Sequence, residues 1–323
     1  MTGRTAVRAS LRAVVPETLR WRWHRLRHHG AMVRGEGGAY YLRFMAMRSA
    51  VWARSAVAQR AYTRLTPGEA ARRRRSHRVF VFGSGYSLNE LPRSAWEHFA
   101  EHDVLGFSGF IHQSWVRVDY HVVRGWDEGP GGLRRQRVSA EAYARRLRDN
   151  ARFRETVYLL QGDYGGLFPQ LLVADRLLPS GAALCWYRTN RYLDNRPGRS
   201  WDAGVSHGAG TLADTVNAAY LLGWREIVLV GVDMYDSRYF WGPPDATLEF
   251  DADGRFAARA DITEHAVRWN APHNTATNGM VDMLGWWADL FQRDGVQLSV
   301  YNPRSLLTRV LPVYPSPAVG AAS

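Results

Sequence analysis

Short apolar segments alternate with longer amphipathic segments from residue 78 to the C-terminal region. The short segments predict strands at Val79–Phe82, Val104–Phe107, Tyr120–Val123, Val157–Leu160, Ile227–Val230 and Leu298–Tyr301. The longer segments predict helices at Leu88–His102, Ala140–Asn150, Thr211–Leu222 and Asn278–Arg293. This alternation is typical of an α/β fold with a mainly parallel, Rossmann-like sheet.

Two segments interrupt the alternation. Residues 161–207 are rich in loop-forming and aromatic residues, and residues 242–272 are polar and irregular. We interpret both as lid-like segments over a site. The strands, helices and lids together form one predicted domain over residues 77–315, and residues 316–323 are expected to be a loose tail.

The segment before this domain, residues 1–76, is basic and amphipathic. It alternates arginine with tryptophan and leucine from Arg20 to Arg27, and a second helix is expected from Tyr41 to Leu65. Residues 1–78 hold 18 arginines and 3 acidic residues, whereas the rest of the chain holds 24 arginines and 27 acidic residues. Basic amphipathic helices suit an anionic membrane surface. The alternatives are helices packed on the main domain, a partly disordered tail, or a nucleic-acid site; no nucleic-acid motif accompanies the charge, so we expect no nucleic-acid partner.

Composition limits the remaining classes of protein. The chain has 323 residues, of which 46% are hydrophobic, which fits a globular core. A single cysteine, Cys185, excludes a disulfide framework and a cysteine-based zinc site. No apolar run reaches the roughly 18–20 residues of a membrane span, and the N-terminus lacks a secretory signal. We expect a cytoplasmic protein, with peripheral attachment to the inner face of the membrane if residues 1–76 bind lipid.

Glycine turns follow two of the predicted strands. Val79–Phe82 leads into Gly83-Ser84-Gly85, and Ile227–Val230 leads into Gly231-Val232-Asp233. Ligands of open α/β sheets bind outside the carboxyl ends of the strands, where glycine lets backbone N–H groups approach a phosphate. Gly83-Ser84-Gly85 is neither a Walker loop nor a full dinucleotide fingerprint. The two turns together predict an enzyme that holds a nucleotide.

Several polar residues near these turns are candidates for a structural or a functional role. Asp233 is either a carboxylate that faces the nucleotide or a turn residue that binds nearby backbone amides. Ser87 and Glu90 have the spacing of a capping box. Tyr235 and Tyr239 either donate hydrogen bonds to a phosphate or pack at the surface.

Two downstream clusters are also open to two interpretations. Asp251 and Asp253 are either a metal-binding pair or a turn. His273 stands before a predicted helix and is a candidate general base, although the chain holds eleven histidines.

Taken in order, these segments resemble the family-42 glycosyltransferases, which are bacterial sialyltransferases, and the wider group with the motility-associated factors and pterin-pyrophosphokinase-like proteins. The run from Gly83 to Glu90 is similar to the family's Gly-Asn-Gly-Pro-Ser-Leu-Lys-Glu. The run from Gly223 to Tyr235 is similar to Gly-Tyr-Lys-Glu-Ile, a strand and Gly-Ile-Asp-Phe-Tyr. A second tyrosine, a histidine before Asn-Thr, and Pro-x-Ser-Leu-Leu are matched by Tyr239, His273-Asn274-Thr275 and Pro303–Leu307.

The resemblance, which covers about residues 79–312, implies a GT-A-like variant of the Rossmann fold. It implies a metal-independent inverting transfer of a sialic-acid-like sugar from a CMP donor to a glycan, glycoprotein or glycolipid acceptor, without a cofactor. His273 is then the base, and Tyr235 and Tyr239 hold the leaving phosphate. The residues expected near the nucleotide are Gly83, Ser84, Gly85, Ser108, Thr211, Gly231 and Asp233, and those near the sugars are Asn274, Arg188 and Arg191, with Arg196 as a further lid arginine.

The chain departs from the family at several positions. Ser84 replaces an asparagine that touches the nucleotide, Tyr86 replaces a proline, and the asparagine that reads cytosine has no clear counterpart near Ser108 or Arg124. Two other functions therefore stay open. One is diphosphate transfer to a pterin with ATP and Mg²⁺, and the other is a non-catalytic scaffold for envelope assembly at the membrane.

Overall fold

The chain divides into two compact units, Met1–Ala50 and Val51–Ser323. The computed structural model describes residues 26–27, 29–30, 33–35, 37–125, 132–163, 167–190, 195–208, 210–235, 238–242, 248–250, 256–258, 276 and 278–315. Helix α3 (Gly38–Ala58) crosses the boundary between the units. Among the described residues, none of the helices has both the length and the apolar character of a membrane span.

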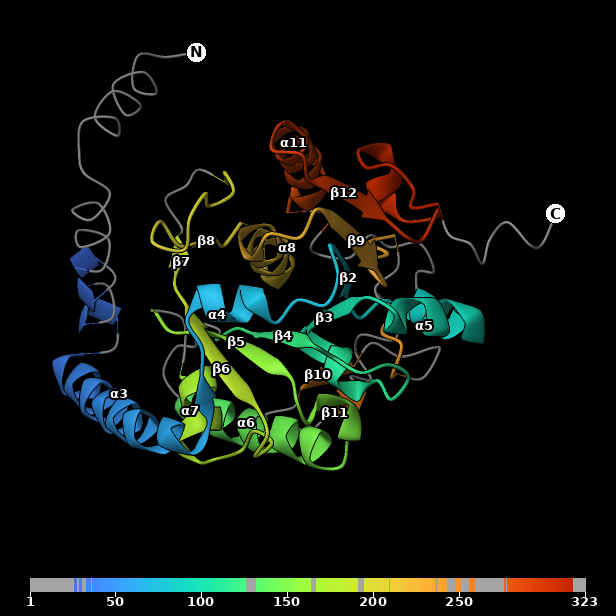
Figure 1. Cartoon of the computed structure of the whole chain (residues 1–323). Coiled ribbons are helices and arrows are strands. Elements are labelled where there is room, and N and C mark those ends of the chain that lie inside the picture. Colours follow the sequence, from blue (N-terminus) through green and yellow to red (C-terminus); the bar gives the residue numbers. More distant parts are fainter. Residues whose placement is uncertain are drawn as a thin grey trace, which may run out of the picture. The chain divides into compact units, whose positions relative to one another are not determined.

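The second unit is built on an eight-stranded sheet (Figure 1). Its order is β1-β6-β5-β4-β3-β2-β9-β12, and every neighbouring pair is parallel. The strands are β1 (Thr63–Arg64), β2 (Arg78–Phe82), β3 (Asp103–Phe107), β4 (Tyr120–Val123), β5 (Val157–Gln161), β6 (Ala183–Tyr187), β9 (Glu226–Val230) and β12 (Gln297–Val300). The predicted α/β class with a parallel, Rossmann-like sheet is confirmed.

The chain reverses its direction across the sheet at β2. From β2 the strands proceed through β3, β4 and β5 to β6, and the chain then returns to place β9 and β12 on the other side of β2. Such a reversal opens a crevice at the carboxyl ends of the two strands that flank it, here β2 and β9. Both strands end in the glycine turns identified in the sequence.

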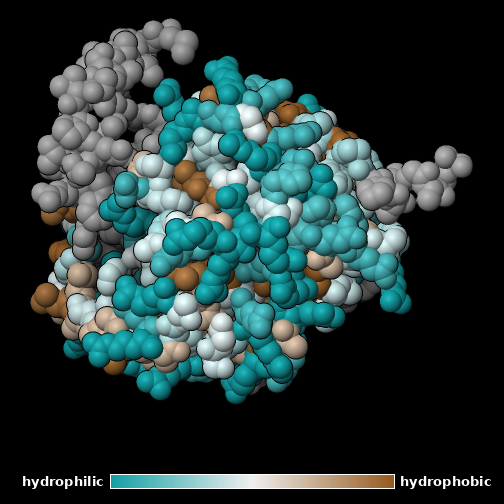
Figure 2. Space-filling model, viewed as in Figure 1, coloured by the Kyte–Doolittle hydropathy of each residue, from teal (hydrophilic) through white to brown (hydrophobic). Residues whose placement is uncertain are grey.

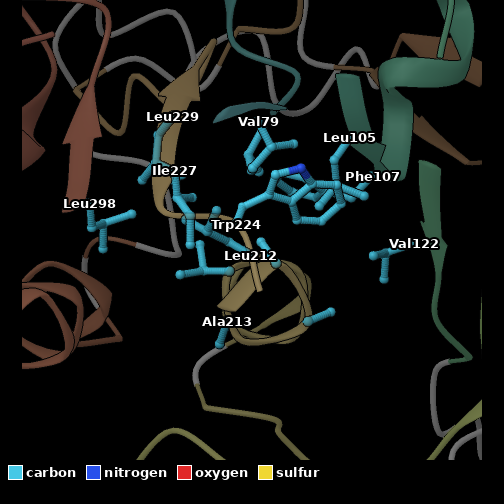
Figure 3. Close-up of a cluster of buried hydrophobic side chains, with 14 of the residues drawn as sticks. Val79, Leu105, Phe107, Val122, Leu212, Ala213, Trp224, Ile227, Leu229 and Leu298 are labelled. Carbon is cyan, nitrogen blue, oxygen red and sulfur yellow. The ribbon is translucent and has the colours of Figure 1, made fainter. Parts of the chain in front are cut away.

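Helices cover both faces of the sheet (Figure 1). One face packs against α4 (Pro67–Arg72), α8 (Thr211–Leu222) and α11 (Met280–Arg293). The other packs against α5 (Arg93–Ala100), α6 (Gly132–Arg148) and α7 (Phe168–Ala174). Because both faces are covered, the strands read as continuous apolar runs. Figure 3 shows the first core, where Val79, Leu105 and Ile227 surround the indole of Trp224 above α8.

Short elements complete the described structure. The 3₁₀ helices are η1 (Gln59–Ala61), η2 (Tyr86–Glu90), η3 (Ser108–His112), η4 (Ala151–Phe153) and η5 (Leu306–Arg309). Strands β7 (Thr189–Asn190) and β8 (Val205–Ser206) form a parallel pair, and β10 (Leu248–Phe250) and β11 (Phe256–Ala258) form an antiparallel pair. The surface shown in Figure 2 is mostly hydrophilic, with apolar residues in small separate patches.

The first predicted lid differs from the structure. Residues 161–207 contain α7 and the buried strand β6, which pairs with β5 on one side and β1 on the other. Cys185 lies on β6, and burial raises the pKa of its thiol to about 12. The first three residues of the strand, Ala183, Leu184 and Cys185, include no β-branched residue, so they give a weak strand signal. Of the second predicted lid, 242–272, the structure describes residue 242, β10 and β11.

The predicted boundary at residue 76 also differs from the structure. Val51, Ser55 and Ala58 of α3 are buried in the second unit, β1 pairs with β6, and the Tyr120 hydroxyl donates to the carbonyl of Ala70 in α4 (2.9 Å). Of the alternatives considered for the basic segment, packing against the main domain is therefore the one that holds for residues 51–76. The capping box of this region is at Thr66 and Glu69, at the start of α4.

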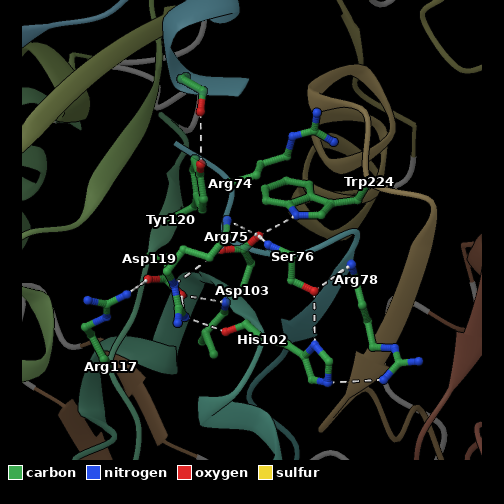
Figure 4. Close-up of polar contacts among 12 residues, drawn as sticks. Arg74, Arg75, Ser76, Arg78, His102, Asp103, Arg117, Asp119, Tyr120 and Trp224 are labelled. Carbon is green, nitrogen blue, oxygen red and sulfur yellow. Dashed lines mark hydrogen bonds and ion pairs between the residues drawn. The ribbon is translucent and has the colours of Figure 1, made fainter. Parts of the chain in front are cut away.

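A polar network lies at the amino ends of the strands, whereas the glycine turns lie at the carboxyl ends (Figure 4). The buried carboxylate of Asp103 accepts hydrogen bonds from Arg75 N (3.1 Å), Ser76 N (3.1 Å) and Trp224 Nε1 (2.8 Å). Burial raises the pKa of Asp103 in spite of these donors. Trp224, part of the sequence resemblance, therefore has a structural role.

Candidate active site

The two glycine turns lie side by side at the carboxyl ends of β2 and β9. Gly83 N donates to Val230 O (2.8 Å), and Gly85 N donates to Gly231 O (2.7 Å). A Cβ on Gly85 would lie 2.4 Å from Asp233 Oδ2, and Gly231 has a φ of +62° with Leu88 packed against its α-carbon. Both positions therefore require glycine.

Asp233 holds the first turn against the second. Its carboxylate is 1% exposed and accepts hydrogen bonds from Ser87 N (2.9 Å), Ser87 Oγ (2.5 Å) and Asn302 Nδ2 (2.9 Å). The amide that Asp233 binds is 146 residues away in the chain, so these contacts hold two segments together and are not those of a local turn. The capping box predicted for Ser87 is wrong, because its hydroxyl donates to Asp233 and Glu90 pairs with Arg304.

The run Pro303–Leu307 forms hydrogen bonds with the second glycine turn. Ser305 Oγ donates to Val232 O (2.7 Å), and Leu306 N donates to Asp233 O (3.2 Å). This run belongs to the sequence resemblance. In the structure the Ser305 side chain and the Leu306 backbone amide fix the backbone that follows β9.

Tyr239 is fixed beside the first turn. It forms an antiparallel bridge with Gly85, and the next residue, Phe240, donates its N–H to Ser84 O (3.2 Å). Its ring stacks on Trp241, with centroids 4.7 Å apart, and Trp241 stacks in turn on His112. Tyr239 therefore begins a row of three stacked rings.

Two cavities meet at this point. A crevice of about 180 Å³ lies over the glycine turns, and a deeper cavity of about 480 Å³ extends from it toward α6. The deeper one is in the size range of small-molecule sites. Four residues line both cavities: Ser84, Ser108, Thr211 and Tyr239.

The amino end of α8 opens into the crevice. Gly210, Thr211 and Leu212 line it, and the N-cap residue Gly210 provides no side-chain hydrogen bond to the first turn of the helix. The amide groups and dipole of such a helix end favour an anion. The crevice thus combines glycine turns, hydroxyl groups and a helix amino terminus, which are the features of a phosphate site.

The structure brings together eight of the residues expected from the sequence. They line the crevice: Gly83, Ser84, Gly85, Ser108, Thr211, Gly231, Asp233 and Tyr239. Tyr235 is not among the residues that line the crevice. Its hydroxyl is 3.5 Å from Asn302 Nδ2, which also donates to Asp233, and the guanidinium of Arg304 lies over its ring.

The expected sugar-binding residues are placed differently. Arg188 lines a separate cavity of about 280 Å³ with Trp52 and Gln170, and it donates to Asp202 O (3.0 Å). Arg196 is exposed. His273, Asn274, Arg191 and the pair Asp251 and Asp253 lie outside the described residues.

Sequence reasoning assigned no role to three polar residues of the deep cavity, although it named Arg124 as a position near which the family's cytosine-reading asparagine has no clear counterpart. His121 is on β4, Arg124 follows β4, and Tyr143 is on α6. Arg124 follows a predicted strand directly, so the strand-end rule could have found it. His121 is hidden inside an apolar strand, and its ring lies beside Gly106 of β3, where a Cβ would be 2.8 Å from His121 Nδ1.

A histidine–carboxylate pair lies near the start of α8. His207 Nδ1 is 3.0 Å from Asp214 Oδ1, and the Tyr187 hydroxyl donates to Asp214 Oδ2 (3.2 Å). Asp214 is fully buried. A carboxylate that orients a histidine is a common arrangement for a general base, so His207 is a second candidate for that role.

Within the described part of the chain, one cluster has the spacing of metal ligands: His98, Glu101 and His102. Its histidines already have other partners. His98 Nε2 contacts the Tyr314 hydroxyl (3.0 Å), and the guanidinium of Arg78 is 3.2 Å from His102 Nε2. A guanidinium at that position opposes a bound cation.

A scan of protein-family models and a search of curated protein sequences found no match to this chain. Among solved structures, a MAf glycosyltransferase from Magnetospirillum magneticum AMB-1 is similar, with a TM-score of 0.39 and 16% identity. The similarity covers 76% of this chain and 36% of that one, so this chain spans about a third of that protein's length. At this TM-score the likeness assigns no function, and the fold assignment rests on the strand order.

Proposed function

We propose that this protein is a glycosyltransferase that binds the phosphate of a nucleotide-activated sugar in the crevice at β2 and β9. The observation that supports this most is the convergence of the two glycine turns, the amino end of α8 and Tyr239 on one crevice. Backbone amides and hydroxyl groups there provide hydrogen-bond donors for an anion. The sequence resemblance supplies the reaction.

The proposed donor is a CMP-activated nonulosonic sugar. The acceptor hydroxyl attacks the anomeric carbon, the bond from that carbon to the phosphate oxygen breaks, and the acceptor proton passes to the base. Tyr239 donates a hydrogen bond to the departing phosphate, where preorganised donors are most effective. No metal is needed in this scheme, and His273 is the proposed base with His207 as its rival.

The cation that pairs with the sugar carboxylate is proposed to be Arg238. It lines the crevice, and its guanidinium lies 4.0 Å from the centroid of the Tyr86 ring, whereas Arg188 lines a separate cavity. An arginine fork matches the geometry of a carboxylate. Stacking on Tyr86 holds the guanidinium near the glycine turn.

A donor screen tests this function. The full chain is incubated with CMP-, UDP- and GDP-sugars in EDTA and, in a parallel reaction, with ATP, a pterin and Mg²⁺. Release of the nucleotide is measured with and without candidate acceptors, and nucleotide binding is measured by thermal shift. We expect turnover of a CMP-sugar in EDTA. Turnover only with ATP, a pterin and Mg²⁺ would favour the diphosphotransferase alternative, and a chain that binds no nucleotide would favour the scaffold.

A further inference from the structure

A third cavity, the side cavity, lies at the carboxyl ends of β5 and β6, along the same edge of the sheet as the phosphate crevice. Its volume is about 280 Å³. Its lining includes the last two residues of β6 and the residue that directly follows each strand: Trp186, Tyr187, Arg188 and Gly162. Ligands of open α/β sheets bind outside the carboxyl ends of the strands. The side cavity therefore has the position of a ligand site.

Helix α3 and the 3₁₀ helix η1 form one wall of the side cavity. The residues of this wall are Trp52, Ser55, Ala56 and Gln59. Val51 and Ala58 of α3 are buried in the core of the second unit, and Arg54 forms an ion pair with Asp175 at the end of α7. These contacts all lie within the second unit, and they hold the wall against the main domain.

Two tryptophans give the side cavity flat apolar surfaces. Trp52 is 42% exposed, and Trp186 is the only residue of β6 that is not buried. A Cβ on Gly162 would lie 3.2 Å from Trp186 Cε3, so the glycine leaves room for this indole. The face of an aromatic ring is apolar and carries partial negative charge, which suits the C–H groups on one face of a pyranose. Two partly exposed indoles on one cavity are therefore suited to a carbohydrate.

Polar side chains line the same cavity. Gln170 on α7 is 3% exposed, and its Nε2 donates to Gln161 O (3.4 Å), whereas its Oε1 is buried and has no partner among the described residues. A buried acceptor without a partner costs free energy and calls for an explanation. A hydroxyl group of a ligand would donate to it. Arg188 donates through Nη2 to Asp202 O (3.0 Å), and its guanidinium has further N–H groups for ligand oxygens.

We propose that the side cavity binds a sugar ring of an oligosaccharide acceptor. A pyranose has a C–H face for the tryptophans and hydroxyl groups for Gln170 and Arg188. A purely apolar ligand, such as an acyl chain, would leave the Gln170 oxygen without a partner. The identity of the sugar as part of the acceptor rests on the proposed function, whereas the carbohydrate chemistry comes from the lining residues.

The place of the side cavity in the sheet indicates which sugar of the acceptor it holds. Four strand spacings of about 4.8 Å separate β6 from β2, which is roughly 20 Å in all. The sugar in the side cavity is therefore not the one that reacts at the glycine turns but a unit further along the oligosaccharide. Substitutions in the cavity should raise the KM of an oligosaccharide acceptor without changing kcat, and they should not affect a monosaccharide acceptor.

Binding of saccharides to the full chain tests the site without any reaction. The probes are disaccharides of glucose, galactose, mannose, N-acetylglucosamine and glucuronic acid, with mannitol as a polyol that has no ring face, and binding is measured by ligand-observed NMR. We expect at least one disaccharide to bind and mannitol not to bind. Trp52→Ala should weaken this binding about tenfold. Trp52→Phe keeps an aromatic ring and should weaken it less.

Two further substitutions and a control locate the binding. Arg188→Ala should weaken it several-fold, and Gln170→Leu should do the same if the variant keeps the wild-type melting temperature. Trp286→Ala is the matched control, because Trp286 is similarly exposed, at 39%, but lies on α11, which packs on the face of the sheet opposite α3. This control should leave the affinity for the disaccharide unchanged.

The outcomes separate this inference from the proposed function. Binding of no disaccharide, or equal disaccharide affinity in the wild type, Trp52→Ala and Arg188→Ala, would overturn it. If a sugar is transferred to an oligosaccharide and these variants keep the wild-type KM for that acceptor, the function stands and the inference fails. If no sugar is transferred but disaccharides bind through Trp52 and Arg188, the carbohydrate site stands and the transferase proposal fails.

Discussion

At the scale of single residues, the polar side chains around the crevice divide into those that hold the backbone and those that face the cavity. The side chains of Asp233, Ser87 and Ser305 form hydrogen bonds that hold the two turns in place. Tyr239 and Thr211 line the cavities. Sequence alone left Asp233 open between the two roles because both place a carboxylate after a buried strand. In the structure the carboxylate binds Ser87 and Asn302 of distant segments and also lines the crevice, so it fits neither interpretation alone.

His121 gives a residue-scale prediction about pH. The unfolded chain binds its proton near pH 6.5, whereas the folded chain binds it only at about pH 3. Between these values the unfolded state holds more protons, so stability falls as the pH drops below about 6.5. Between pH 7 and pH 5 the free energy of unfolding of His121→Phe should fall by about 2 kcal/mol less than that of the wild type. Urea unfolding at the two pH values measures this difference. Equal losses in the two proteins would contradict the prediction.

The base is a second prediction at this scale. His273→Ala should lower kcat by about 10²–10⁴ with little change in nucleotide affinity or melting temperature. His207→Ala is the comparison, because His207 has the carboxylate partner Asp214 in the described structure. If only His207→Ala abolishes turnover, the base is His207. Wild-type turnover with a lowered melting temperature in His273→Ala would mean that this residue only stabilises the fold.

At the scale of elements, six strands were predictable because a strand buried on both faces is a continuous apolar run. Helix α8 (Thr211–Leu222) matches its prediction at both ends, helped by Gly223 in a left-handed conformation after its last residue. Strand β6 was missed because Ala, Leu and Cys give no strong strand signal. The predicted helix Leu88–His102 is in fact η2 and α5, separated by Leu91 and Pro92.

The amino-terminal segment gives a prediction at the element scale. Leu42, in the described part of the first unit, is 67% exposed beside the exposed Arg43, and residues 1–50 hold 10 arginines and 2 acidic residues. We expect the full chain to sediment with anionic liposomes at low salt and to be released by salt. A chain that begins at Val51 keeps the packed residues 51–76 and should stay in the supernatant. Equal sedimentation of the two would rule out lipid binding by this segment.

At the scale of the whole molecule, the reversal of strand order at β2 determines where the site lies. It brings together two turns that are about 150 residues apart in the chain, and the glycine pattern alone was enough to predict both. The deep cavity could not be predicted in this way. It depends on the packing of α6 against β4 and on the ring of Trp241, which are contacts between distant segments that leave no local pattern.

The most direct test of the central claim is turnover of a CMP-activated nonulosonic sugar in EDTA by the wild type, Tyr239→Phe and Tyr235→Phe. Tyr239 lines both cavities, whereas Tyr235 lies beside Asn302. We predict that the wild type turns over the donor and that Tyr239→Phe lowers kcat by about 10²–10³, more than Tyr235→Phe does. Absence of turnover with any nucleotide sugar, or wild-type kcat in Tyr239→Phe, would contradict the account.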